Sequence, residues 1–187
     1  MVFARSAAYP PEVVWAALLR AVNLGARNKV PMAPLRALFE REGCAGVRTY
    51  VQSGNVVFRH PSPDADALAA AIADEFGVDT VVVLRRARQL RTLAARHPFG
   101  KDTSATHVAF PAAALRPRDR TALLELAEGK DELAIVAGEI VLRYPGGFQK
   151  ARLTPPRIER ELGFPVTARN WRTVTQLAAM TSATAIP

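Results

Sequence analysis

The sequence contains a single cysteine, Cys44, so it cannot form an intramolecular disulfide framework. This is typical of a reducing compartment, and because no base lies nearby in the sequence, we interpret Cys44 as a small buried hydrophobe. No stretch approaches the roughly 20 consecutive apolar residues that a membrane-spanning helix needs. Arg5 is not followed by the apolar core of a signal peptide. We therefore expect a cytosolic protein with no membrane partner.

Motifs for metal, nucleotide or nucleophile chemistry are also missing. His60, His97 and His107 are scattered, without cysteine or carboxylate partners at metal-ligand spacing. The sequence has no GxGxxG, no GxxxxGK[ST] and no GxSxG. These absences predict no bound metal and no cofactor.

Lysine is scarce, with four among the 25 basic residues, although the net charge is +8 and the pI is about 10.5. The densest basic cluster is Arg85, Arg86, Arg88, Arg91 and Arg96, spread along a predicted helix. Two interpretations stay open: a solvated helix face, or a stripe that follows a nucleic-acid backbone. The second predicts an affinity that falls steeply with salt, because binding would release counterions.

What is present is ordinary globular material, with 49% hydrophobic and 22% charged residues. Residues 1–12 show no periodicity and are interpreted as a tail. Hydrophobic periodicity and turn residues then predict alternating strands and helices. In order these are a strand over 13–22, a helix over 31–43, strands over 47–52 and 56–58, a helix over 62–77, a strand over 78–84 and a helix over 88–96.

The second part of the chain repeats this order. It comprises a strand over 106–110, a helix over 117–126, strands over 132–137 and 139–144, a helix over 157–162, a strand over 166–170, and a terminal helix with a Thr173–Gln176 capping box. The order is that of a ferredoxin-like unit. We predict an α+β fold of two ferredoxin-like βαββαβ halves in tandem, each with an appended helix, over 13–100 and 101–187.

The predicted strands are apolar throughout, which indicates that both faces of each sheet are covered. An open sheet face that stacks RNA bases is therefore disfavoured.

Topology gathers polar residues at two sheet edges. In a sheet of order 4-1-3-2, the first two strands end at the same edge, so the loop after the first strand should adjoin the first hairpin. This first cluster consists of Arg20, Asn23, Asn28, Lys29, Gln52, Ser53 and Asn55. In the second half, residues 169–171 should lie close to residues 146–150, which gives a second cluster of Lys150, Arg169, Asn170 and Trp171.

Each cluster combines cations, amides and flexible backbone, the groups that bind phosphate or carboxylate. Lys29 also precedes a helix N-terminus, which attracts anions. Structural roles compete with this interpretation: Asn55 could shape a turn, Asn170 and Thr173 could cap a helix, and Trp171 could pack in the core.

Three stretches, LLRAVNLGARNKVPMAPLRALFEREG, VRTYVQSGNVVF and TARNWRTVTQL, closely resemble the bacterial domain-of-unknown-function 1697 family. The resemblance extends from Val14 to Met180 and implies an α+β fold with ferredoxin-like halves. It implies no activity, since none is established for the family. Its motifs fall on both clusters and add Thr173 to the candidate residues. Ala21 and Ala26 stand where the family usually has glycine.

The first hypothesis is a protein that binds a small anionic ligand, phosphorylated or nucleotide-like, through these clusters. One alternative is non-specific binding of nucleic acid. The other is an enzyme of unknown reaction at the same site, with Ser53 or Lys29 taking part.

Overall fold

The structure is a computed structural model, and it describes residues 13–25, 28–127 and 129–182. The N-terminal unit contains β1 (Val13–Leu19), α1 (Met32–Arg41), β2 (Ala45–Tyr50), β3 (Asn55–His60), α2 (Ala65–Phe76), β4 (Val82–Arg86) and α3 (Ala87–Ala94). The C-terminal unit contains β5 (Thr106–Pro111), α4 (Pro117–Glu125), β6 (Glu132–Val136), β7 (Glu139–Arg143), the 3-10 helix η1 (Phe148–Lys150), α5 (Pro155–Leu162), β8 (Val166–Asn170) and α6 (Trp171–Ser182). The predicted tail over 1–12 and Ala26 lie outside the described residues.

Each unit contains one four-stranded antiparallel sheet. The strand orders are β2-β3-β1-β4 and β6-β7-β5-β8, which confirms the predicted 4-1-3-2 order in both units. The fold is therefore mixed α and β, with two sheets and six α-helices in the described part of the chain.

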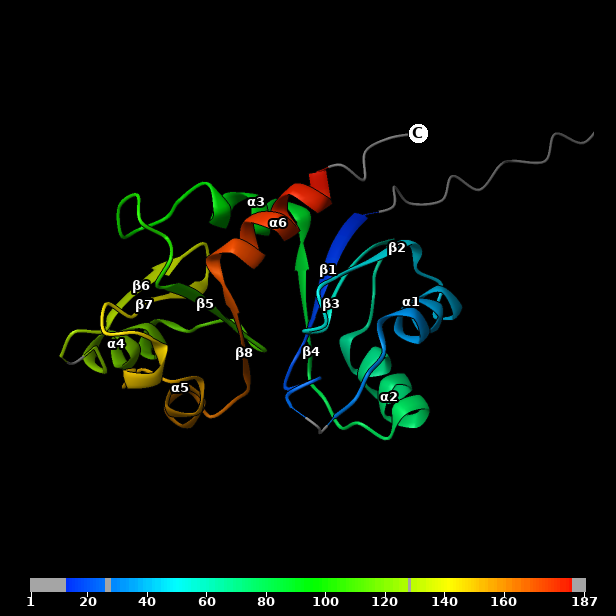
Figure 1. Ribbon diagram of the computed structural model, residues 1–187, viewed down its shortest axis with the longest axis horizontal. Helices are drawn as coiled ribbons and strands as arrows, with labels where there is room; N and C mark the ends of the chain where they lie inside the picture. The colour runs from blue at the N-terminus through cyan, green and yellow to red at the C-terminus, as the bar shows by residue number, and fades with distance from the viewer. Residues whose placement is uncertain (1–12, 26–27, 128, 183–187) are drawn as a thin grey trace, which may run out of the picture.

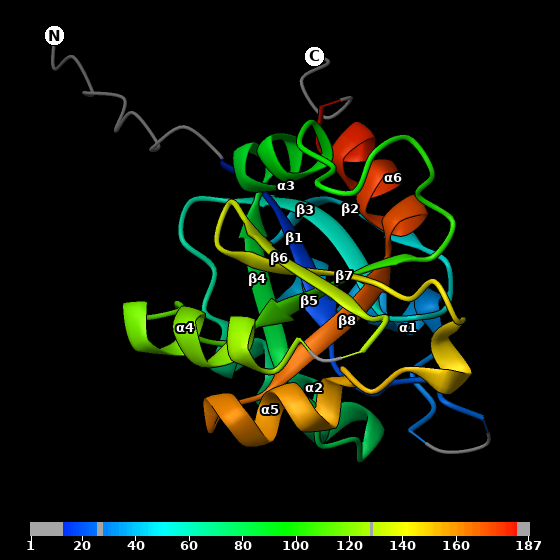
Figure 2. The ribbon, with the colours of Figure 1, turned by 90° about the vertical axis from the view of Figure 1, so that its left-hand side faces the viewer.

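The helices divide into an outer and an inner set (Figure 1). Helices α1 and α2 cover the outer face of the first sheet, and α4 and α5 cover that of the second. Helices α3 and α6 contact each other, and both views place them side by side at one end of the molecule (Figure 2).

The inner faces of the two sheets share one apolar core, in which Leu18 and Val57 of the first sheet pack in the same cluster as Val108 and Val141 of the second. Because each sheet also packs against its outer helices, both faces are buried, as the unbroken apolar strands predicted.

Local signals explain most helix boundaries. Asp64 caps α2 by accepting from the backbone N–H groups of Asp66 and Ala67, and Gly77 ends that helix in the left-handed conformation. The predicted capping box at Thr173 is wrong. Helix α6 begins at Trp171, and the Asn170 Oδ1 accepts from the Thr173 N–H, so Asn170 is the cap.

Three strand predictions were displaced, and one of these strands covers Ala45–Tyr50 rather than 47–52. The first strand ends at Leu19 rather than at Val22, because the chain turns at Ala21 with a φ of +56°. The fourth strand covers Val82–Arg86 rather than 78–84, so Arg85 belongs to a strand and not to a helix face. No helix in the described part of the chain combines the length and the apolar composition needed to cross a membrane.

Candidate ligand-binding site between the two units

The loop after β1 and the first hairpin are held together by Asn23. Its Oδ1 accepts from the Val30 N–H at 2.9 Å, and its Nδ2 donates to the carbonyl oxygens of Val30 and Gln52 at 2.9 and 2.8 Å. The backbone N–H of Leu19 also donates to the Gly54 carbonyl. The predicted proximity of this loop and this hairpin is confirmed, and Asn23 is the residue that joins them.

Two candidate residues of the loop serve its own backbone. The Asn28 Nδ2 donates to the Ala21 carbonyl at 2.9 Å, and the Lys29 ammonium donates to the Gly25 carbonyl at 2.8 Å. Asn23 and Asn28 adopt positive φ, which asparagine tolerates better than most residues. Both asparagines are thus explained by the shape of the loop.

The hairpin packs closely against this loop at Gly54. A Cβ built on Gly54 would lie 2.5 Å from the Val22 Cγ2 and 2.7 Å from the Leu19 Cβ, and the glycine has a φ of +69°. Next to it, the buried Asn55 donates from Nδ2 to the Tyr50 carbonyl and to the Ser53 Oγ. The side-chain oxygen of Asn55 is left to face the other unit.

Arg169 of β8 extends into the N-terminal unit and donates to oxygen atoms of the loop and the hairpin. Its Nε donates to the Asn55 Oδ1 at 2.6 Å, and its Nη2 donates to the carbonyls of Leu19 and Ser53 at 2.8 and 2.9 Å. Its Nη1 donates within its own strand, to Thr167 and Ala168. All five N–H groups of this guanidinium therefore have partners, and every partner is neutral.

The charge of Arg169 is not neutralised by a carboxylate anywhere in the described chain. The side chain is only 8% exposed, and burial lowers the pKa of Arg169 to about 10. The residue therefore remains a cation at neutral pH. Buried charges are ordinarily paired, so this one is unusual.

A second arginine, Arg20, lies close to this region and is paired. Its Nε and Nη2 donate to the two carboxylate oxygens of Glu159 at 2.7 and 2.9 Å, joining the loop after β1 to α5. Burial raises the pKa of Glu159, but hydrogen bonds from Arg20 and from the Val166 N–H outweigh this and hold that pKa below its usual range. Glu159 is therefore an anion, and it orients Arg20.

These groups surround a cavity of about 400 Å³ between the two units, a volume within the usual range for ligand sites. Its lining residues are Leu19, Arg20, Ala21, Val22, Leu24, Ser53, Phe148, Pro155, Pro156, Glu159, Val166, Thr167, Ala168 and Arg169. We call this hollow the inter-unit cavity. Of the predicted site residues, it brings together Arg20, Ser53 and Arg169, with Asn55 directly behind them.

The predicted second cluster is confirmed only in part: Phe148 and Arg169 line the inter-unit cavity together, and the other members lie elsewhere. Lys150 lines a different hollow with Lys130 and Arg152. Asn170 and Trp171 line a third, beside Lys101–Ser104. The reason is that η1 and α6 lie on opposite faces of the second sheet: Phe148 packs against Tyr144 on the outer face, whereas Trp171 lies in the core between the sheets. Thr173 is buried in α6 and contributes no side chain to the inter-unit cavity.

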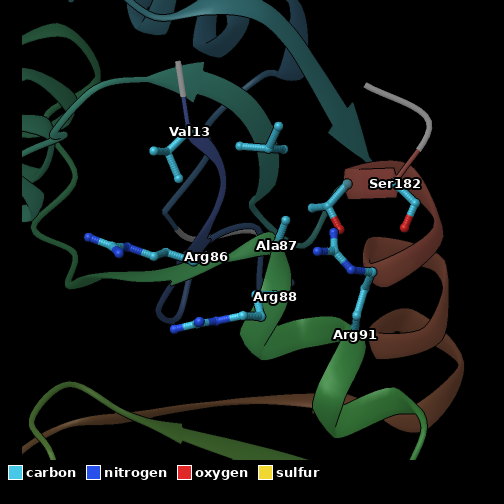
Figure 3. A pocket seen from close by; sticks show the side chains of 8 residues that line it. Val13, Arg86, Ala87, Arg88, Arg91 and Ser182 are labelled. Carbon is cyan, nitrogen blue, oxygen red and sulfur yellow. The ribbon is translucent and has the colours of Figure 1, made fainter. Parts of the chain in front are cut away.

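A further hollow, of about 620 Å³, lies where α3 meets the start of β1 and the end of α6 (Figure 3). Arg86, Arg88 and Arg91 line it, and they are exposed, as predicted for a solvated face. Figure 3 shows Arg91 directed toward the end of α6, whereas Arg86 and Arg88 extend away from it. Arg91 therefore diverges from Arg86 and Arg88, and these three side chains do not form one continuous stripe.

Arg85 does not belong to that solvated face. Its Nε and Nη2 donate to the two carboxylate oxygens of Glu139 at 2.6 and 3.0 Å, and Nη2 also donates to the Pro111 carbonyl at 2.7 Å. Both side chains of this ion pair are largely buried between the units. The expectation that all five arginines of the cluster are solvated is wrong at this position.

Sequence reasoning missed Glu159 and Leu24 as parts of the cavity. Phe148 was expected near residues 169–171 but was not named as a site residue, and it lines the cavity with Arg169. Glu159 lies in an amphipathic helix where a charged residue signals nothing unusual. The exposed Leu24 and Phe148 carried a weak signal, as large apolar residues within polar, glycine-containing loops. Within residues 13–25, 28–127 and 129–182, no three His, Cys, Asp or Glu side chains are grouped so as to hold a metal ion.

Comparison with known proteins connects this chain to others through sequence and fold. A comparison with curated proteins gives no match. The chain resembles the solved structure of the conserved bacterial protein SP0830 from Streptococcus pneumoniae, with a TM-score of 0.68 over 91% of this chain and 99% of that one. At 22% sequence identity, that likeness concerns the fold alone. The model of the family "Protein of unknown function (DUF1697)" matches residues 13–140, more than half of the chain. The chain therefore belongs to the DUF1697 family of proteins of unknown function.

Proposed function

We propose that this protein binds a small organic anion in the inter-unit cavity. One observation carries the proposal: the Arg169 guanidinium is buried, lines the cavity, and meets neutral oxygens but no carboxylate in the described chain. A buried charge without a counter-ion costs free energy, and an anion from solution would offset that cost. The cavity has the volume to admit one.

The direct contacts would come from other groups. Because every N–H of Arg169 already has a partner, this residue would act through its positive field. Arg20 uses Nε and Nη2 for Glu159, which leaves its Nη1 as a donor without a partner among the described residues. The Ser53 hydroxyl accepts from Asn55 and keeps its own hydrogen to donate. Both groups line the cavity.

The first test compares the affinity for inorganic phosphate, AMP, glucose 6-phosphate and benzoate in calorimetry and thermal-shift measurements. We expect at least one of these anions to bind, and Arg169→Gln, which removes the charge, to weaken that binding at least about tenfold. Arg169→Lys keeps the charge and should retain part of the affinity.

The matched control is Arg85→Gln, because Arg85 also crosses between the units but lies outside the inter-unit cavity. It should destabilise the protein and leave the affinity for the anion within about twofold of the wild type. An Arg169→Gln variant that binds as tightly as the wild type, or a wild type that binds none of the four anions, would refute the proposal.

The two alternatives gain less support. An enzyme needs a base near Ser53 or Lys29, and the contacts of these residues in the described chain are with Asn55 and with a backbone carbonyl. Nucleic-acid binding needs a continuous basic stripe, and the exposed arginines near α3 diverge.

The proposal keeps three further expectations from the sequence. We place the protein in the cytosol, where small organic anions are abundant. We assign each unit to the ferredoxin-like class, supported by the repeated element order and the shared strand order. We also retain the domain ranges 13–100 and 101–187, supported by the connection between α3 and β5, which contains no helix or strand.

A further inference from the structure

The walls of the inter-unit cavity are mainly apolar, and this narrows the class of anion. Leu19 and Val22 are buried against it, and Pro155 and Ala168 add to its lining. An apolar wall gains free energy only when it is covered by apolar surface. A highly charged, fully hydrated ligand would leave this surface unused.

The mouth of the cavity carries exposed apolar side chains from both units. Among the described residues, the exposed large hydrophobic side chains are Leu24, Val51, Leu124 and Phe148. Leu24 is 66% exposed and Phe148 is 50% exposed, and both line the inter-unit cavity. Leu24 comes from the loop after β1 and Phe148 from η1, so a ligand in the cavity would contact both units.

The charges in the cavity limit how negative the ligand can be. Arg20 and Arg169 are cations and Glu159 is an anion, so the ionised side chains that line the cavity leave a net charge of one positive unit. Glu159 would repel a second anionic group placed beside the first. A polyphosphate usually lies on a cradle of glycine-rich backbone N–H groups. The loop here has one glycine, Gly25, at its described left-handed positions, and the others are Ala21, Asn23 and Asn28.

We infer that the ligand carries a single carboxylate-type anionic group on an apolar body, rather than the phosphorylated or nucleotide-like group expected from the sequence. The inference rests on the proposed function and specifies its ligand. A planar carboxylate accepts from the Arg20 Nη1 and the Ser53 hydroxyl, while the apolar body lies between Leu24 and Phe148. Arg169 supplies the charge that the carboxylate neutralises.

The test measures binding to the full chain by calorimetry with benzoate, 4-phenylbutyrate, benzamide, inorganic pyrophosphate and ATP. We expect both carboxylates to bind and 4-phenylbutyrate to bind more tightly, since its body is larger. Benzamide has the shape of benzoate without the charge and should bind at least about tenfold more weakly.

Two variants at the mouth complete the test. Phe148→Ser removes an exposed ring, so it should leave the fold intact and weaken 4-phenylbutyrate about tenfold. Leu124→Ser is the matched control, because Leu124 is equally exposed and does not line the inter-unit cavity. It should leave the affinity for 4-phenylbutyrate unchanged.

The outcomes separate this inference from the proposed function. If ATP or pyrophosphate binds more tightly than the carboxylates and loses that affinity in Arg169→Gln, the cavity is an anion site but the inferred ligand class is wrong. If 4-phenylbutyrate binds equally well to Phe148→Ser and wild type, the inferred contact between the apolar body of the ligand and Phe148 is wrong. If no anion binds, or if Arg169→Gln leaves the affinity unchanged, both the inference and the proposed function fail.

Discussion

Arg85 and Arg169 are the fourth residues of β4 and β8, and each crosses to the opposite sheet. The Arg85 Nε donates to the side chain of Glu139, and the Arg169 Nε donates to the side chain of Asn55. Each acceptor is the first residue of the third strand in the opposite unit. Each also donates from Nη2 to the carbonyl of the last residue of the other unit's first strand, Pro111 or Leu19. The repeated units thus make the same crossing contact twice, in opposite directions.

The two contacts differ in charge, and the hairpins explain why. The β6–β7 turn has two residues, Ala137 and Gly138, because Val136 pairs directly with Glu139. The β2–β3 turn has four residues, because Tyr50 pairs with Asn55. In this longer turn the Asn55 Nδ2 donates to the Tyr50 carbonyl, a bond that a carboxylate cannot make. An amide is therefore required at position 55, and Arg169 is left without a counter-ion.

The cavities beside the two arginines differ in volume, and the larger one lies beside the arginine that has no counter-ion. The hollow next to the neutralised Arg85 has a volume of about 220 Å³, and the inter-unit cavity next to Arg169 has about 400 Å³. One copy of a repeated contact is thus a closed ion pair, and the other combines an uncompensated cation with a larger space. This difference supports our proposal that a ligand binds on the Arg169 side, and it makes the Arg85 side the internal control.

The largest expected difference between the two hairpins concerns glycine. Gly54 precedes Asn55 and Gly138 precedes Glu139, and both have positive φ. A Cβ at position 54 would clash with Val22 and Leu19, whereas none of the described atoms lies within 4 Å of one at position 138. Gly54→Ala should therefore cost about 2–4 kcal/mol in the free energy of unfolding, and Gly138→Ala about 1 kcal/mol. Chemical denaturation measures both; equal costs would mean that the loop and the hairpin are not in close contact.

The next change makes the Arg85 side resemble the Arg169 side. Glu139→Gln keeps the shape of the side chain and removes its charge, so Arg85 would be buried beside an amide. We expect a loss of about 2–3 kcal/mol in the free energy of unfolding, because a buried charge loses its counter-ion. Denaturation in urea at neutral pH measures this, with Glu132→Gln as a control on the more exposed Arg143–Glu132 pair.

The reverse change, which gives Arg169 a carboxylate partner, should not raise the free energy of unfolding by the same amount. Asn55→Asp neutralises Arg169, but it loses the donor to the Tyr50 carbonyl and places a carboxylate oxygen beside that carbonyl. We therefore expect the free energy of unfolding to stay unchanged or to fall. A stabilisation of about 2 kcal/mol would show that the turn does not require an amide, and the hairpin explanation would be wrong.

The strand order and the adjacency of loop and hairpin could be predicted because both follow from topology. Once apolar runs identify the strands, the antiparallel order places the loop after β1 beside residues 52–55. The sequence also indicated Arg20, Ser53 and Arg169 as site residues, since they stand in polar motifs at strand ends.

The packing of one unit on the other could not be predicted in this way. Periodicity shows that a face is buried without showing what buries it, so the crossing of Arg169 into the first unit had no sequence signal. For the same reason the prediction of the second cluster was correct only for Phe148 and Arg169, which line the inter-unit cavity together. The side of the sheet on which η1 and α6 lie depends on packing, and this separates Lys150 from Trp171.

The smallest expected effect concerns Ala21 in the loop that lines the inter-unit cavity. Its φ of +56° is one that glycine adopts freely and alanine adopts at a cost of about 1–2 kcal/mol. Glycine also adds flexibility to the unfolded chain, which offsets roughly 0.4–1 kcal/mol of the gain. Ala21→Gly should therefore raise the free energy of unfolding by about 0.5–1 kcal/mol. The control is Ala70→Gly in α2, an exposed position in the helix interior where the same change should lower the free energy of unfolding by about 1 kcal/mol. If both variants lose stability equally, Ala21 is not strained, and the left-handed turn that shapes this wall of the cavity is incorrect.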